Sequence, residues 1–172
     1  IVLGIIDCDK PIIARVNGSA VGLGATMALF CDIIVMAEHA KIGDPHVRVG
    51  FVAGDGGAII WPQLVGYARA KEFLLTGDLM TATEAERIGL VNHAVPADQL
   101  DAKVAAFVSK LAHGARQSIR WTKAATNIGL RQLAHMAMDA SLAYEALSNQ
   151  TRDHQEAVNA FREKRKPVFS GR

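Results

Sequence analysis

Short apolar runs separated by polar and glycine-rich turns fill the first half of the chain. Residues 11–16 (PIIARV) and 32–37 (DIIVMA) are typical of buried strands, and the first run opens on a proline, where a missing N–H is tolerated. Residues 40–43 form a third, shorter candidate strand. A fourth strand is predicted over 90–95, where Pro96 ends it. The first half therefore holds four short predicted strands.

Helices are predicted in the segments between these strands. A short one is expected over residues 24–31, directly after a glycine-rich turn. Two more are predicted over 58–65 and 68–75, with a break at Gly66 between them. The stretch TATE has the capping-box pattern, which predicts a helix over 82–89.

The final third of the chain is helical in pattern. Apolar residues recur every three or four positions over 100–111 and again over 130–147, which indicates two amphipathic helices. At the other end, residues 1–6 are apolar and are expected to be the end of a preceding element, followed by a short turn at 7–10. Strands alternating with helices first, and helices last, indicate an α/β fold with a helical C-terminal region.

Composition narrows the class of protein. Of 172 residues, 50% are hydrophobic and 21% charged, and the formal net charge is +2, which is typical of a globular domain and gives no reason to expect nucleic acid. The longest apolar runs are too short to span a bilayer, and no signal peptide is recognisable, so a cytoplasmic location without membrane contact is expected. Cys8 and Cys31 form neither a disulfide framework nor a metal-binding pattern.

Several stretches of sequence, in this order and at these distances, together resemble the enoyl-CoA hydratase/isomerase (crotonase) superfamily. They are KPIIARVNG at 10–18, GLG at 22–24, CDI at 31–33, LTGD at 75–78, ATEAERIGLVN at 82–92, and AF followed by EKRKP at 160–167. The resemblance implies a crotonase-like ββα-spiral core, of which residues 1–95 are the C-terminal part, and a helical trimerisation region over 96–172. It also implies that the N-terminal portion of the family fold precedes Ile1.

The shared chemistry of this family is stabilisation of an enolate formed from an acyl-CoA thioester, as in fatty acid metabolism. Two preorganised backbone N–H groups must point at the thioester oxygen, and a glycine-rich turn lets the backbone approach it closely. By family position the oxyanion-hole donor is Leu23, with Gly24 beside it. The residues implied to line the acyl pocket are Gly22, Thr26, Pro45 and Gly54. An ordinary tight turn between strand and helix is the alternative interpretation of the GLG stretch.

The acid–base residues depart from the family pattern. Hydratases of the family carry two glutamates, and Thr26 and His46 stand at those positions here. His46, expected on a strand, can act as a base because an imidazole titrates near neutral pH, and Asp55 is predicted to fix its tautomer. The alternatives are a histidine hydrogen-bonded to backbone and an aspartate that caps the next helix. Asp44, before a proline, is predicted to be a turn former.

Three functions stay open. The first is a lyase or isomerase acting on acyl-CoA thioesters, with CoA present only as part of the substrate and with no other cofactor. The second is hydrolysis of a carbon–carbon bond in a cyclic β-diketone, because the spacing of His46 and Asp55 resembles that branch, although Leu23 stands where those enzymes have a further histidine. The third is a non-catalytic module with the crotonase fold.

The basic C-terminal segment has its own implied role. In the family the last helix crosses to a neighbouring subunit of a homotrimer or hexamer, and a lysine there approaches the CoA phosphates. Lys164 occupies that place, with Phe161 as the apolar contact one turn earlier. A solvated charged face is the simpler alternative. The remaining histidines show no ligand spacing, so no metal is expected.

Overall fold

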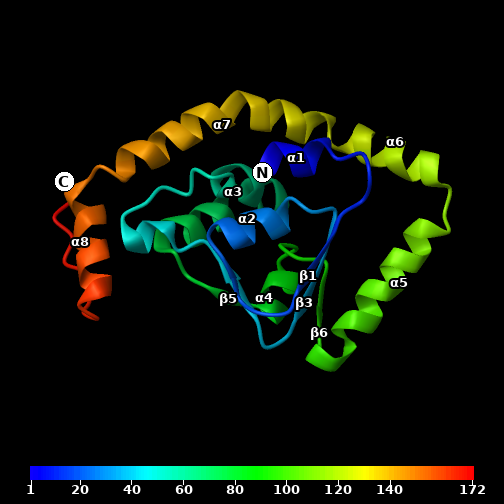
Figure 1. Cartoon of the computed structure of the whole chain (residues 1–172), viewed down its shortest axis with the longest axis horizontal. Coiled ribbons are helices and arrows are strands. Elements are labelled where there is room, and N and C mark those ends of the chain that lie inside the picture. Colours follow the sequence, from blue (N-terminus) through cyan, green and yellow to red (C-terminus); the bar gives the residue numbers. More distant parts are fainter.

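A computed structural model describes residues 1–172 (Figure 1). The strands are β1 (Ile13–Val16), β2 (Ala20–Val21), β3 (Ile33–Ala37), β4 (Lys41–Gly43), β5 (Met80–Thr81) and β6 (His93–Val95). The α-helices are α1 (Val2–Asp7), α2 (Leu23–Leu29), α3 (Gly57–Thr76), α4 (Ala82–Arg87), α5 (Leu100–Ala112), α6 (Arg116–Thr126), α7 (Ile128–Ser148) and α8 (Arg152–Arg162). Two 3₁₀ turns, η1 (His46–Val49) and η2 (Ala97–Gln99), complete the chain.

The strands form two small sheets. In one, β1, β3 and β6 are all parallel, and in the other β4 lies between β2, which is parallel to it, and β5, which is antiparallel. Strands and helices alternate up to β6 and only helices follow, which confirms the predicted α/β order. All four predicted strands are present with shorter bounds, while β2 and β5 were not predicted, because two-residue strands carry no periodicity.

Local signals located most helices correctly. The predicted interruption at Gly66 is confirmed, since its φ of 76° and ψ of 161° are not helical. The Thr81 hydroxyl accepts a hydrogen bond from the Glu84 backbone N–H at 3.2 Å, which is the predicted cap of α4. Both C-terminal amphipathic helices are present as α5 and α7. No helix combines the length and apolar character that crossing a membrane requires.

The expectation that residues 1–6 are the end of a preceding element stays a prediction. Residues Val2–Asp7 form the helix α1, so Asp7 belongs to a helix and not to the predicted turn. Val2 and Ile6 are buried on its inner face, and α1 packs against α7 and α2. A six-residue helix has little stability of its own, so packing against the two other helices stabilises it. The helix α6 was not predicted separately, since its one buried residue is a lysine and no apolar stripe marks it.

Figure 1 shows the C-terminal helices as a border around the strands and α1 to α4, with α7 running along one side. The main hydrophobic core lies beneath α7, and its largest fully buried side chains include Trp61, Leu29 and Met36. A second, smaller cluster joins β3 to α5. The core thereby holds α2, α3 and α7 in fixed relation, and the candidate site lies where these three helices meet the loops between them.

A buried ion pair joins α6 to the strands. The ammonium of Lys123 is 2.7 Å from Asp32 Oδ2 and 3.0 Å from the Lys10 carbonyl oxygen, and the same Asp32 oxygen accepts the Ile12 backbone N–H at 2.7 Å. Lys123 is 7% exposed, so its charge depends on these acceptors.

We expect Asp32→Ala to lower the free energy of unfolding by about 3 kcal/mol, because it leaves a buried ammonium with one neutral acceptor. Chemical denaturation followed by circular dichroism measures this. Glu84→Gln, which removes only an exposed ion pair with Arg87, is the control and is expected to change stability by less than about 1 kcal/mol. Equal effects of the two substitutions would contradict the interpretation.

Candidate active site

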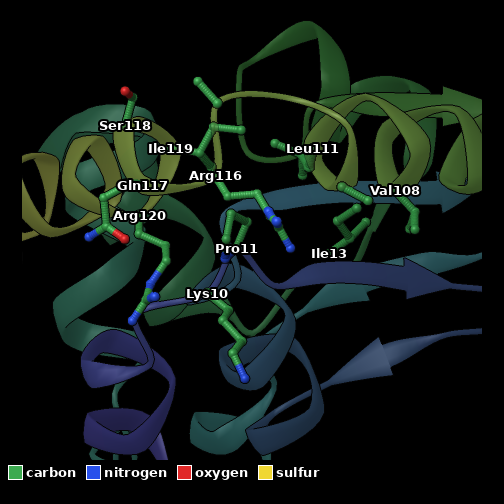
Figure 2. Close-up of a pocket in the computed structure, with 12 residues that line it drawn as sticks. Lys10, Pro11, Ile13, Val108, Leu111, Arg116, Gln117, Ser118, Ile119 and Arg120 are labelled. Atoms are coloured by element: carbon green, nitrogen blue, oxygen red, sulfur yellow. The ribbon is translucent and has the colours of Figure 1, made fainter.

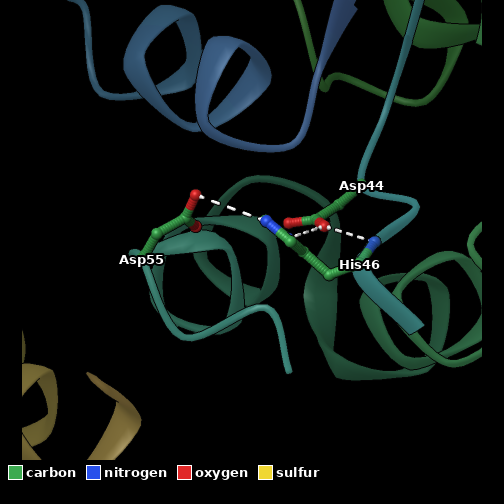
Figure 3. Close-up of side chains that lie close together, drawn as sticks. All are labelled: Asp44, His46 and Asp55. Atoms are coloured by element: carbon green, nitrogen blue, oxygen red, sulfur yellow. Dashed lines mark hydrogen bonds and ion pairs between the residues drawn. The ribbon is translucent and has the colours of Figure 1, made fainter. Parts of the chain in front are cut away.

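Four parts of the chain meet around His46. They are the glycine turn before α2, the segment that follows β4, the loop before α3 and the C-terminal half of α7. Figure 3 shows three of the side chains, with the His46 ring between Asp44 and Asp55. Asp44 and His46 are two residues apart, whereas Asp55 arrives from the next loop.

Asp44 holds the His46 ring in place. Its Oδ1 accepts hydrogen bonds from His46 Nδ1 and from the His46 backbone N–H, the latter at 3.3 Å. An ionised carboxylate has no proton to give, so Nδ1 carries the hydrogen and Nε2 is left for other partners. Asp44 is 1% exposed. The predicted roles were therefore wrong in part: Asp44, and not Asp55, fixes the tautomer, because a turn returns its side chain to the residue two positions on.

His46 itself lies on the 3₁₀ turn η1, and its predicted place on a strand was wrong. The strand β4 ends at Gly43, and Pro45 follows with a φ of −85° and no N–H to extend a ladder. The strand thus ends before Asp44, and the half-buried Pro45 begins the turn that places the imidazole beside Gly22, at the start of α2.

Asp55 faces the other ring nitrogen. Its Oδ2 lies 3.8 Å from His46 Nε2, while its Oδ1 accepts the Thr26 hydroxyl at 3.0 Å and the Gly57 backbone N–H at 3.3 Å. The Asp55 side chain thus accepts the first N–H of α3, but the N-cap residue of that helix is Gly56, so the alternative interpretation of Asp55 as the N-cap was wrong by one residue. Thr26, which is fully buried, therefore supports a carboxylate at the position where family hydratases carry one.

The electrostatics favour the charged form of His46. The hydrogen bond to Asp44 is the largest effect raising the pKa of His46, and burial of the ring opposes it. The charges of Asp44, Asp55 and Glu145 raise the pKa of His46 further. Glu145, on α7, was not identified from the sequence, where it is one polar residue on an amphipathic helix with no motif around it.

The glycine turn adjoins the imidazole. Gly22 has a φ of 54° and a ψ of −126°, and a Cβ added there would lie 3.4 Å from His46 Nε2. Leu23 and Gly24 follow as the exposed first residues of α2, where backbone N–H groups have no preceding helical carbonyl and no side chain caps them. The turn thus brings backbone donors and the His46 ring to the same place.

Asp44, His46 and Asp55 also form a possible metal-ligand set, with one donor atom of each within 4.8 Å of the others. Two carboxylates and an imidazole suit several divalent cations. The hydrogen bond between Asp44 Oδ1 and His46 Nδ1, however, already uses two of these donors. The absence of a metal stays a prediction.

Two other predicted residues lie apart from this cluster. The base of α8 contacts η1, where His154 Nδ1 is 2.8 Å from the Val49 carbonyl oxygen. Phe161 lies seven residues further along α8, about 10 Å away by helical rise, and Lys164 follows the end of that helix. The structure therefore does not bring Phe161 or Lys164 to the His46 cluster of the same chain.

A cavity of about 840 Å³ lies away from His46 (Figure 2). It opens between the start of β1 and the segment that joins α5 to α6, and its cationic side chains are Lys10, Arg116 and Arg120. A second hollow of about 550 Å³ runs along β1 and reaches Gly24 on α2. Only the second one adjoins the glycine turn.

We expect Asp44→Asn to lower the pKa of His46, because the substitution removes the carboxylate that accepts the Nδ1 hydrogen. Because the pKa of His46 is raised in the folded state, its ion pair with Asp44 contributes its full stability below about pH 6.5, the ordinary histidine value. This contribution is lost as the pH rises through the folded-state pKa of His46. The stability difference between wild type and variant should therefore shrink at alkaline pH. Titration of the His46 ring protons by NMR, with denaturation at several pH values, measures both. An unchanged His46 titration would refute the assignment.

Known proteins match this chain in sequence along most of its length. The chain matches the family model described as enoyl-CoA hydratase/isomerase over residues 2–172. It is 39% identical over 161 residues to crotonyl-CoA hydratase of Syntrophomonas wolfei subsp. wolfei, with 94% of this chain and 62% of that protein covered. It is 36% identical over 168 residues to 2,3-dehydroadipyl-CoA hydratase of Escherichia coli K12, with coverage of 95% and 64%.

The fold agrees as well. A crystal structure of an enoyl-CoA hydratase/isomerase from Pseudoalteromonas atlantica T6c superposes with a TM-score of 0.92 at 30% identity, covering 98% of this chain and 68% of that one. The predicted crotonase-like α/β fold with a helical C-terminal region is thereby confirmed. The chain spans about six tenths of the length of the curated relatives named above. It belongs to the enoyl-CoA hydratase/isomerase (crotonase) family.

Proposed function

We propose that this chain carries the acid–base part of an enzyme that hydrates or isomerises enoyl-CoA thioesters through an enolate. The observation that carries the proposal is the contact between the His46 ring and Gly22, directly before the free N–H groups of α2. Enolate chemistry requires a group that moves a proton and a backbone donor that stabilises the resulting oxyanion. Here the His46 ring and the first N–H groups of α2 are adjacent. The names of the relatives, all hydratases or isomerases of CoA esters, support the same reaction class.

In the proposed mechanism the Leu23 N–H donates to the thioester oxygen, with Gly24 next to it in the same turn. As negative charge develops on that oxygen, the donor becomes more effective than in the ground state, which is how a fixed amide accelerates the step. Gly22, with its positive φ, lets the turn lie against His46 without a side chain between them. Three further residues lie beside the proposed acid–base groups. Thr26 donates a hydrogen bond to Asp55, Pro45 precedes His46, and Gly54 precedes Asp55.

His46 supplies the proposed base. In the neutral form of the ring, Nδ1–H donates a hydrogen bond to Asp44 and Nε2 carries the lone pair that accepts a proton, and the raised pKa of His46 makes Nε2 the stronger base. In hydration Nε2 takes a proton from water, the water oxygen forms a bond to the β carbon, and the α carbon of the enolate receives a proton from Nε2 or from Asp55. In isomerisation Nε2 takes the α proton and returns it at the γ carbon. Asp55, 3.8 Å from Nε2, is the proposed second group for this transfer.

Hydrolysis of a carbon–carbon bond is a second candidate for the same site. The observation that favours it is the pairing of His46 Nε2 with the Asp55 carboxylate, which could activate water toward a ketone. The departure at Leu23, where the diketone-hydrolysing branch has a histidine, favours the CoA-ester reaction instead.

We also propose that CoA is held partly by the end of α8 of a neighbouring copy in a homotrimer or hexamer. Phe161 is 86% exposed, and Lys164, with a φ of 55°, turns the chain away at the end of the helix. A long cationic side chain beside an exposed aromatic ring suits a nucleotide phosphate. Their distance from His46 in one chain supports a site shared between copies. No other cofactor is included in the proposal.

The reaction class is tested with short and medium 2-enoyl-CoAs, 3-enoyl-CoAs and a cyclic β-diketone, using the full-length protein. We expect turnover of a CoA ester, and a loss of kcat/KM on the order of 10²-fold or more in His46→Ala and Asp55→Asn. Activity on the diketone alone would select the second candidate. Full activity of His46→Ala would refute its role as base, and absence of all turnover would favour a non-catalytic module.

Lys164→Ala tests the CoA contact separately. We expect KM for a CoA ester to rise several-fold with little change in kcat, because the lost contact is to the non-reacting part of the substrate. Lys110→Ala, which removes an exposed lysine on α5, is the matched control and should leave KM unchanged. If Lys164→Ala leaves both KM and CoA-ester affinity at their wild-type values, α8 is not part of the CoA site.

A further inference from the structure

The helix α7 presses against the loop that carries Asp55. A Cβ added to Gly54 would overlap the Ser141 carbonyl oxygen and would lie 2.6 Å from Glu145 Cβ, so only glycine fits there. Ser148 reinforces the contact: its hydroxyl accepts the Val52 backbone N–H at 3.1 Å and donates to the Glu145 carbonyl oxygen at 2.7 Å. One helix therefore holds the loop at Val52 and at Gly54.

This contact brings a further carboxyl group to the site. Glu145 Oε2 would lie 2.9 Å from a Cβ on Gly54, the residue before Asp55. That oxygen is shielded from solvent and has no hydrogen-bond partner, although the rest of the side chain is partly exposed. A shielded, unpartnered carboxylate oxygen is unfavourable, and neither the fold nor the packing of α7 explains why a glutamate stands there.

The neighbours of Glu145 are the groups of the proposed acid–base site. Asp55 on the loop, His46 on η1 and Asp44 after β4 are the charged groups that act on it. Three carboxyl groups and one imidazole, from four parts of the chain, therefore share one small region. If all three carboxyls ionised, the single imidazolium could not neutralise them.

We propose that Glu145 is a positioning residue of this site, which fixes the Asp55 turn through its contact with Gly54 and adds a carboxylate beside the acid–base groups. The inference rests on the proposed role of His46 and extends it to a residue of the C-terminal helical region. Glu145 reaches the site at Gly54, the residue before Asp55.

The titration behaviour of the two residues is consistent with this geometry. Burial is the main cause that raises the pKa of Glu145, and the Asp55 charge adds to it, whereas the His46 charge opposes it. In turn the Glu145 charge raises the pKa of His46. Removing the Glu145 carboxylate should therefore destabilise the imidazolium form of His46 and lower the pKa of His46.

Glu145→Gln is the test, since it keeps the size of the side chain and removes its charge. Asp139→Asn, an exposed carboxylate on the same helix, is the matched control. The His46 ring-proton signal, assigned by its absence in His46→Ala, is titrated by NMR in the full-length protein, and the pH dependence of kcat/KM is measured beside it. We expect Glu145→Gln, and not Asp139→Asn, to shift the His46 titration to lower pH and to lower kcat/KM on the order of 10- to 100-fold.

The outcomes separate this inference from the proposed function. A His46 titration that is the same in Glu145→Gln as in wild type overturns the inference, whatever the activity. A shifted titration without turnover of any CoA ester leaves the inference standing and contradicts the proposed function. If Glu145→Gln does not fold, Glu145→Asp, which retracts the charge by one methylene, takes its place, and an unchanged His46 titration in that variant overturns the inference equally.

Discussion

The buried carboxylate of Asp44 is the constraint on which the rest of the site depends. Its side chain is fully buried, its Oδ2 has no hydrogen-bond partner, and its Oδ1 is bonded to His46. A carboxylate in such surroundings is tolerated only where a donor or an opposite charge offsets its lost hydration. His46 cannot turn away without leaving that charge unpartnered, so the orientation of the imidazole follows from the stability of the fold around it.

Four glycines make room for this arrangement. Each stands where a Cβ would meet a polar side chain of the site, so the backbone can pack directly against functional groups. The pairs are Gly22 with His46, Gly54 with Glu145, Gly56 with Thr26, and Gly57 with Asp44. Three of these glycines lie in the one turn before α3 and at its first residue, which explains why the stretch AGDGGA looks like a loop in sequence and yet packs as part of the core.

The sequence predicted what local signals determine, and missed what depends on contacts across the chain. The interruption at Gly66 and the Thr81 cap are local, and both are confirmed. The pairing of Asp44 with His46 depends on the geometry of a turn around a proline, which spacing alone does not reveal. Glu145 lies ninety residues after Asp55, so only the packing of α7 brings them together. The contribution of Phe161 and Lys164 stays a prediction, because it requires a second copy of the chain.

The resemblance implies that Thr26 and His46 stand where family hydratases carry two glutamates, and the geometry bears on what this departure means for the proposed reaction. Thr26, at one glutamate position, donates a hydrogen bond to Asp55, so a carboxylate is still held near that place, although it comes from another loop. His46 stands at the other position. The 3.8 Å between His46 Nε2 and Asp55 Oδ2 exceeds a hydrogen bond, so neither atom is committed to the other. A substrate atom that lies beside the pair, within hydrogen-bond distance of both, could exchange a proton with either one, which supports a site with changed acid–base groups over one that has lost them.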